Sequence, residues 1–70
     1  MEMTPVDSSN ILAIGYDPDS AILNIAFKDG SKYEYYDVPR HEFDNFLAAD
    51  SKGKYGNKNI YKRYNQQKIG

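Results

Sequence analysis

The residues best suited to chemistry lie between Ser51 and Lys68, a segment rich in lysine, tyrosine and glycine. Its two glycines would leave backbone N–H groups free, and the lysines and hydroxyl groups around them favour an anion such as a phosphate. A neighbouring tyrosine could stack on a base. The candidate ligand-binding residues are Ser51, Lys52, Gly53, Lys54, Tyr55, Asn57, Lys58, Tyr61 and Lys62, together with Tyr36 from an earlier strand.

The charges are unevenly distributed along the chain. Residues 1–50 have a net charge of −7, and residues 51–70 have +6 with no acidic residue, which together give the −1 of the whole chain. This polarity indicates an anion-facing end on an acidic body, and the acidic body disfavours a long nucleic acid. The alternative is a solvated glycine loop whose lysines only balance the acids.

Catalytic and metal-binding arrangements are weak in this sequence. His41 is the single histidine, and Glu42 and Asp44 beside it supply too few ligands on one helix turn for a metal site. No nucleophile motif accompanies His41. We therefore expect no catalytic residue, no metal and no cofactor, and we expect the protein not to be an enzyme.

Length and composition limit the architecture. Seventy residues without cysteine form a single domain with a thin margin of stability and no disulfide, which favours assembly into a homo-oligomer. No apolar run is long enough for a membrane span, and the acidic start Met1-Glu2-Met3 is not typical of a signal peptide. A cytoplasmic protein with no membrane partner is expected.

The spacing of apolar residues predicts an α+β fold. Residues 1–7 have no periodicity and are expected to be a flexible lead-in, followed by one domain at 8–68. Alternation predicts a three-stranded antiparallel meander with strands near 10–16, 21–28 and 32–38. The first connection is a turn at Asp17–Ser20, and the second is a three-residue loop with Gly30 in the left-handed conformation.

The register of this meander assigns each side chain to a sheet face. One face forms the core with Leu12, Ile14, Tyr16, Leu23, Ile25, Phe27, Tyr33 and Tyr35, and the opposite face carries Lys32, Glu34 and Tyr36. Tyr33 and Tyr35 could alternatively form a stacking platform for bases. The parity of the strands favours the core role.

Two helices of unequal length are expected to pack on one sheet face. The first follows Pro39 for about three turns and covers the sheet with Phe43, Phe46 and Leu47. A glycine loop then leads to a short helix from an N-cap at Asn57 to about Gln67. In that helix Ile60, Tyr64 and Gln67 face inward, and Lys58, Tyr61, Lys62 and Asn65 face outward.

The order of these motifs resembles the KTSC domain family. The resemblance extends from about Val6 to Tyr64 and rests on Ser8-Ser9, Tyr16-Asp17, Phe27-x-x-Gly30, Tyr33-Glu34-Tyr35, Val38-Pro39, Ser51-x-Gly53-x-Tyr55 and Ile60. That family is a short domain with a central Tyr-x-Tyr, found alone in bacteria and phages or at the C-terminus of some lysyl-tRNA synthetases. Gly56 replaces an aromatic residue common in the family, which predicts a more open loop.

Three functions are compatible with these observations. We favour a non-catalytic module that binds a small phosphate-bearing nucleotide in a pocket shared between subunits. Cyclic or signalling nucleotides are included, as for phage proteins that sequester immune signals. The resemblance to domains of lysyl-tRNA synthetases implies RNA binding as an alternative. The third hypothesis is protein–protein assembly without a ligand, anchored by Tyr36, Tyr55 and Tyr61.

Overall fold

Three central strands form the antiparallel meander that the alternation predicts. The computed structural model describes residues 2–70, and these strands are β2 (Ile11–Asp17), β3 (Ile22–Phe27) and β4 (Lys32–Tyr35). Phe27 and Ser31 close the loop between β3 and β4, since the Phe27 N–H donates to the Ser31 carbonyl at 2.8 Å, and three residues lie between them. Gly30 has a φ of +96°. The predicted three-residue loop with a left-handed glycine is confirmed.

Two short edge strands extend the meander to five strands, where the sequence predicted three. β1 (Met3–Pro5) pairs with β2, and β5 (Gln66–Lys68) pairs with β4, giving the order β1-β2-β3-β4-β5. β1 therefore lies within the expected lead-in 1–7, of which residue 1 is outside the described residues. Both strands satisfy backbone groups that β2 and β4 would otherwise leave unpaired.

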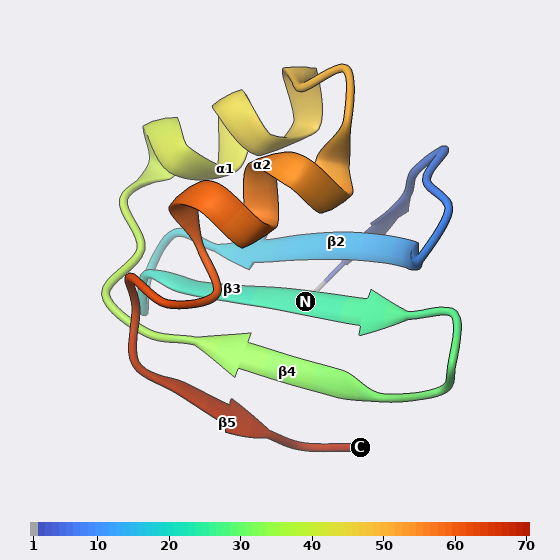
Figure 1. Cartoon of the computed structure of the whole chain (residues 1–70). Coiled ribbons are helices and arrows are strands. Elements are labelled where there is room, and N and C mark those ends of the chain that lie inside the picture. The colour runs from blue at the N-terminus through green and yellow to red at the C-terminus, as the bar shows by residue number, and fades with distance from the viewer. Residues whose placement is uncertain (1) are drawn as a thin grey trace.

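Both helices cover the same face of the sheet (Figure 1). Helix α1 spans Arg40–Ala48, directly after Pro39, and helix α2 spans Lys52–Asn59. The expected glycine loop and the N-cap at Asn57 are wrong, because Ser51 caps α2 by accepting from the Lys54 N–H at 3.4 Å. The chain after Asn59 forms turns and then β5, so the expected helix to Gln67 is also wrong. No helix within residues 2–70 is long and apolar enough to cross a membrane.

The core lies between the helices and the sheet. Its fully buried side chains are Ile11, Ile14, Leu23, Ile25, Val38, Phe46 and Ile60. Tyr35 pairs with Leu23 and is only 2% exposed, and Tyr33 pairs with Ile25 and is half-buried. The predicted core role of Tyr35 is confirmed, and burial raises its pKa above the usual value.

A β-bulge at the start of β2 corrects one core assignment. Ile11 pairs with Phe27 and Ala13 with Ala26, so Leu12 is an extra residue on its strand. Such a bulge redirects side chains. Ile11 consequently fills the core position, and Leu12, which was expected there, is 55% exposed on the outside.

A buried carboxylate joins the helical layer together. Glu42 of α1 is only 6% exposed, and its two oxygens accept from the hydroxyls of Tyr55 in α2, at 2.6 Å, and Tyr64, at 3.1 Å. Burial, reinforced by Glu42, raises the pKa of Tyr55 to about 12, and that of Tyr64 is raised for the same reasons. The cluster links α1, α2 and the turns that follow α2.

Replacing Tyr35 with alanine should destabilise the fold strongly. Truncating a fully packed aromatic side chain leaves a cavity and costs about 3–5 kcal/mol. The measurement is the free energy of unfolding from urea titration. Tyr36→Ala, on the neighbouring position of the chain, is the control and should cost much less, since Tyr36 faces outward. Equal losses in the two variants would contradict the register.

The fold should lose stability at alkaline pH. Because the folded-state pKa of Tyr55, about 12, lies above its ordinary value of 10.0, this group contributes stability that is fully present below pH 10. That contribution is lost as the pH rises toward 12. Urea titrations at increasing pH should therefore show a falling free energy of unfolding. Tyr55→Phe should start from a lower stability and fall less steeply; an unchanged slope would contradict the assignment.

Candidate ligand-binding groove

A groove lies between the segment before β2 and the helix α2. Its volume is about 590 Å³, and it is lined by Ser9, Asn10, Ser51, Gly53, Lys54, Asn57 and Tyr61. Five of these residues were candidates from the sequence: Ser51, Gly53, Lys54, Asn57 and Tyr61. The structure thus brings half of the predicted site together on one side of α2.

Local hydrogen bonds hold the first wall of the groove in place. The Ser8 hydroxyl accepts from the Ile11 N–H at 3.3 Å and donates to Asn10 Oδ1 at 3.2 Å. The Asn10 carbonyl accepts from the Lys28 N–H at 2.9 Å, which connects this segment to the end of β3. Asn10 Oδ1 also lies 3.0 Å from the position of a Cβ built on residue 53, so the two walls approach closely at Gly53.

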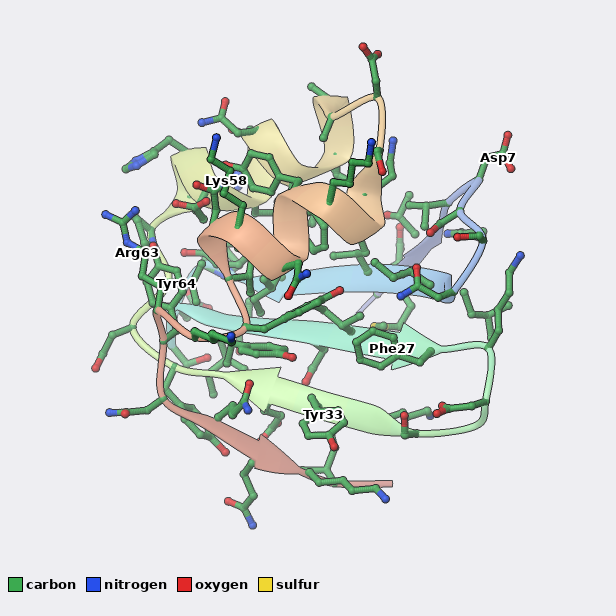
Figure 2. The ribbon with its side chains drawn as sticks, in the orientation of Figure 1. Asp7, Phe27, Tyr33, Lys58, Arg63 and Tyr64 are labelled. Atoms are coloured by element: carbon green, nitrogen blue, oxygen red, sulfur yellow. The ribbon has the colours of Figure 1, made fainter. Side chains whose placement is uncertain are left out.

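Aromatic rings form the end of the groove. The Tyr61 ring packs 6.0 Å from Phe27 and 6.1 Å from Tyr35, and Phe27 packs 5.9 Å from Tyr33. Figure 2 shows Phe27 and Tyr33 on adjacent strands, on the sheet face that carries the helices. Phe27, Tyr33 and Tyr61 are each half-buried. They present a partly accessible aromatic surface beside the groove.

Tyr61 was expected on an exposed helix face, and the structure corrects this. Its ring lies against buried Gly56, where an added Cβ would be 2.6 Å from the phenol oxygen. The expectation that Gly56 opens a loop is therefore wrong, since Gly56 gives a helix room for this ring. Burial raises the pKa of the Tyr61 hydroxyl. Among residues 2–70 that hydroxyl has no hydrogen-bond partner.

Two candidate residues next to the groove are used structurally. Tyr55 turns inward to Glu42 and stacks on Phe46 with ring centroids 5.6 Å apart, so it is not available to stack on a base. The Lys52 ammonium donates to the Ala49 carbonyl at 2.8 Å. Lys52 lines a separate polar hollow together with Asp7 and Asp50.

Three further candidates lie outside the lining of the groove. Lys58 and Lys62 are exposed, and Figure 2 shows Lys58 near Arg63 and Tyr64, at the end of α2 distant from Asp7. Tyr36 donates its hydroxyl to Glu34 at 3.0 Å and to Gln67 at 3.2 Å. Its outward direction agrees with the predicted register, but Tyr36 belongs to the opposite face of the sheet.

A neighbouring hollow of about 420 Å³, which the sequence analysis missed, shares Ser9 and Asn10 with the groove. This hollow is lined by Ser9, Asn10, Phe27, Lys28 and Asp29. The Asp29 carboxylate accepts from the N–H and hydroxyl of Ser31, at 2.9 and 2.6 Å, which lowers its pKa. Lys28 and Lys54 are therefore the cations that line the groove and its neighbouring hollow. The dipeptide Ser8-Ser9 was the one sequence feature that could have indicated this hollow, but no local pattern linked it to residues near position 54.

The fold and these sequence motifs define a small α+β domain built on a sheet with a central Tyr-Glu-Tyr strand. Residues 7–64 match the KTSC domain family, and the chain belongs to that family. The crystal structure of a KTSC domain protein from Yersinia pestis superimposes with a TM-score of 0.93 at 43% identity, covering 99% of this chain and 97% of that one. The recognition made from the sequence is confirmed.

Bacterial relatives match over most of their length. A protein of Tsukamurella paurometabola is 47% identical over 62 residues, which cover 89% of this chain and 92% of the relative. An uncharacterised protein of Stutzerimonas stutzeri is 37% identical over 57 residues, with 81% and 80% coverage. The chain is therefore similar to these bacterial proteins over most of their length.

The effect of Gly56→Ala on the free energy of unfolding should change sign when Tyr61 is also replaced. Alanine is the better helix former by about 1 kcal/mol, but in the wild-type chain its Cβ would collide with the Tyr61 ring. Gly56→Ala should thus lower the free energy of unfolding, whereas adding Gly56→Ala to Tyr61→Ala should raise it. A double-mutant cycle measured by urea titration tests this. The same sign in both backgrounds would contradict the packing.

Proposed function

We propose that the groove binds a small phosphate-bearing nucleotide without converting it. The observation that supports this most is that the start of α2, with Ser51, Gly53 and Lys54, lines the same groove as Asn57 from its later turn and the aromatic ring of Tyr61. A phosphate group and a base need these two environments side by side. Signalling nucleotides, including cyclic ones, belong to this ligand class.

The phosphate would lie at the first turn of α2. Backbone N–H groups at a helix start carry partial positive charge and are common phosphate ligands. The exposed Lys54 adds a full charge at the same place, and the Ser51 hydroxyl lies on the groove wall. Lys28 supplies a second cation in the neighbouring hollow.

The base would pack against Tyr61 and Phe27. Their half-buried rings offer apolar area to a planar ligand, and stacking on one aromatic side chain contributes about 1–3 kcal/mol per base. Asn10 and Asn57 line the same groove and carry amides that can both donate and accept hydrogen bonds. These groups could read the edge of a base.

The lining supports binding more than catalysis. The residues of the groove itself include no carboxylate, imidazole or thiol that could serve as a general base or strong nucleophile. The groove is formed within one chain, so the proposal does not require the second subunit invoked from the sequence. Asp7 and Asp50 line the neighbouring hollow and favour a compact anion over a long RNA.

Lys54→Ala should weaken nucleotide binding by at least about tenfold, the contribution of one hydrogen bond to a charged group. The measurement is isothermal titration calorimetry against a panel of mono-, di- and cyclic nucleotides and a short RNA. Lys62→Ala is the matched control, because it removes the same charge from an exposed position outside the groove. Equal affinities of Lys54→Ala and the wild type would contradict the proposed phosphate position.

Salt dependence separates the alternative functions in the same experiment. RNA binding should weaken steeply with salt, with a slope of about −0.7 for each phosphate contacted, whereas a small nucleotide should show a shallow slope. Chromatography of the nucleotide after incubation should recover it unchanged. A steep slope with preference for RNA would support the RNA alternative, and absence of binding to every ligand would support assembly alone.

A further inference from the structure

The second face of the sheet is open. Both helices lie on one side, and no helix or strand formed by residues 2–70 covers the other (Figure 1). Residues that alternate with the core positions point to this outer face. They include Met3 of β1, which pairs with Gly15, and Ala26 of β3, which pairs with Lys32 of β4. The outer face therefore spans all five strands.

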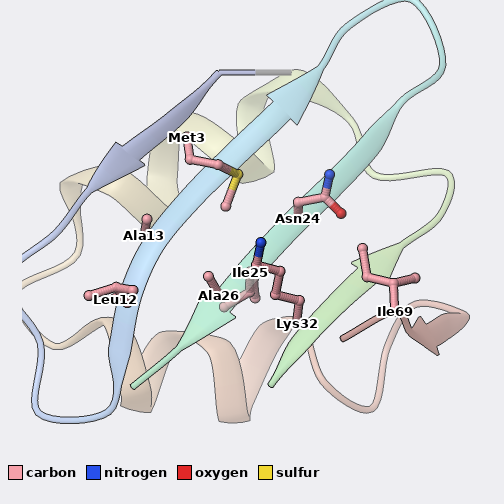
Figure 3. A pocket seen from close by; sticks show the side chains of 8 residues that line it. All are labelled: Met3, Leu12, Ala13, Asn24, Ile25, Ala26, Lys32 and Ile69. Carbon is pink, nitrogen blue, oxygen red and sulfur yellow. The ribbon is translucent and has the colours of Figure 1, made fainter. Parts of the chain in front are cut away.

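Part of this outer face is apolar, and Asn24, Lys32 and Glu34 lie on the same face. The large hydrophobic side chains that are exposed, Leu12 at 55% and Ile69 at 48%, both border it. They rim a hollow of about 390 Å³ that is also lined by Met3, Ala13, Asn24, Ile25, Ala26 and Lys32 (Figure 3). The solvent-facing side of a two-layer antiparallel fold is ordinarily polar. Contiguous exposed apolar area of this kind marks an interaction surface.

The bulge at Leu12 contributes to this surface directly. In a regular strand Leu12 would lie on the core face with Ile14 and Tyr16, and Ile11 would lie on the outer face. The bulge instead buries Ile11 and exposes Leu12. The strand thus supplies an apolar residue to each face. Because Leu12 does not contribute to the core, its apolar side chain would be of use only in a contact with a partner on the outer face.

The outer face carries both raised and small apolar residues, and it carries opposite charges, which a second copy of the same face could match. Leu12 and Ile69 stand at the rim of a hollow floored by Ala13 and Ala26, so a copy rotated by 180° can insert its raised residues above the small ones. Lys32 and Glu34 project from the same face of β4. The same rotation lets the lysine of each copy approach the glutamate of the other.

We propose that two copies of this chain pack their outer sheet faces together in a two-fold dimer. The chain measures 28 × 24 × 23 Å. A face of that size buries roughly 500–600 Å² per chain, at the lower end of specific interfaces, which predicts a reversible dimer. Few charges on the face argue against an anionic membrane, which would require a basic surface. The binding groove lies on the opposite side and stays accessible in such a dimer.

Analytical ultracentrifugation of the full chain without ligand tests the dimer. From low micromolar to near millimolar concentration, the mass of the wild type should rise from that of a monomer toward twice that value. Leu12→Lys and Ile69→Lys should each raise the dissociation constant at least about tenfold, because a two-fold axis places two added charges in one interface. Both positions are half-exposed, and circular dichroism should show that the variants fold.

Ala48→Lys is the matched control, since it adds the same charge at an exposed position of α1 on the other side of the sheet. It should dimerise like the wild type, as should Lys54→Ala, so this result is independent of nucleotide binding. A wild type that stays monomeric at all concentrations would overturn the proposal. A dimer that persists unchanged in both Leu12→Lys and Ile69→Lys would also overturn it.

Discussion

The position of α2 depends on one buried carboxylate. A charged group removed from water is tolerated only when hydrogen bonds compensate for the lost hydration, and Glu42 receives two of these from Tyr55 and Tyr64. The three residues come from α1, from α2 and from the turns before β5. Satisfying Glu42 therefore fixes the angle of α2 above the sheet and directs the chain toward the sheet edge. The groove exists because α2 is held at this distance from the segment containing Asn10.

The sequence predicts the central meander because its apolar alternation and its turn residues indicate the same fold. Alternating apolar residues, the turn beginning Asp17-Pro18 and a left-handed Gly30 all specify one parity, in which Tyr35 is core. The first hairpin nevertheless pairs two residues further along than a turn at Asp17–Ser20 would give, since Tyr16 pairs with Leu23. The edge strands escaped prediction for a physical reason: Gln66–Lys68 is polar throughout, and β1 is only three residues long. Their pairing is determined by the unsatisfied edges of β2 and β4, which no local pattern encodes. The bulge at Leu12 is likewise set by the packing of Ile11.

Half of the residues predicted for the candidate site line the groove, because most of them belong to one helix, α2, or to its N-cap. Residues near each other in α2 were grouped correctly, but helix boundaries decide which side chains share a face. Gly53 and Gly56 disfavour helix, so the helix was expected to begin six residues later than it does. That error directed Tyr55 and Tyr61 outward. Asn10 and Phe27 could not be associated with Lys54 from sequence, since only the folded sheet brings them together.

The contact between Gly56 and Tyr61 bears on how fast the groove can be occupied. The Tyr61 ring packs against α2 at Gly56 and beside Phe27 and Tyr35, and its remaining surface lines the groove. A ring held in this way loses little rotational freedom when a ligand arrives, so the entropic penalty of binding is small. For the proposed nucleotide, such a preformed wall predicts association limited by diffusion and orientation, with differences in affinity among ligands residing in their residence times.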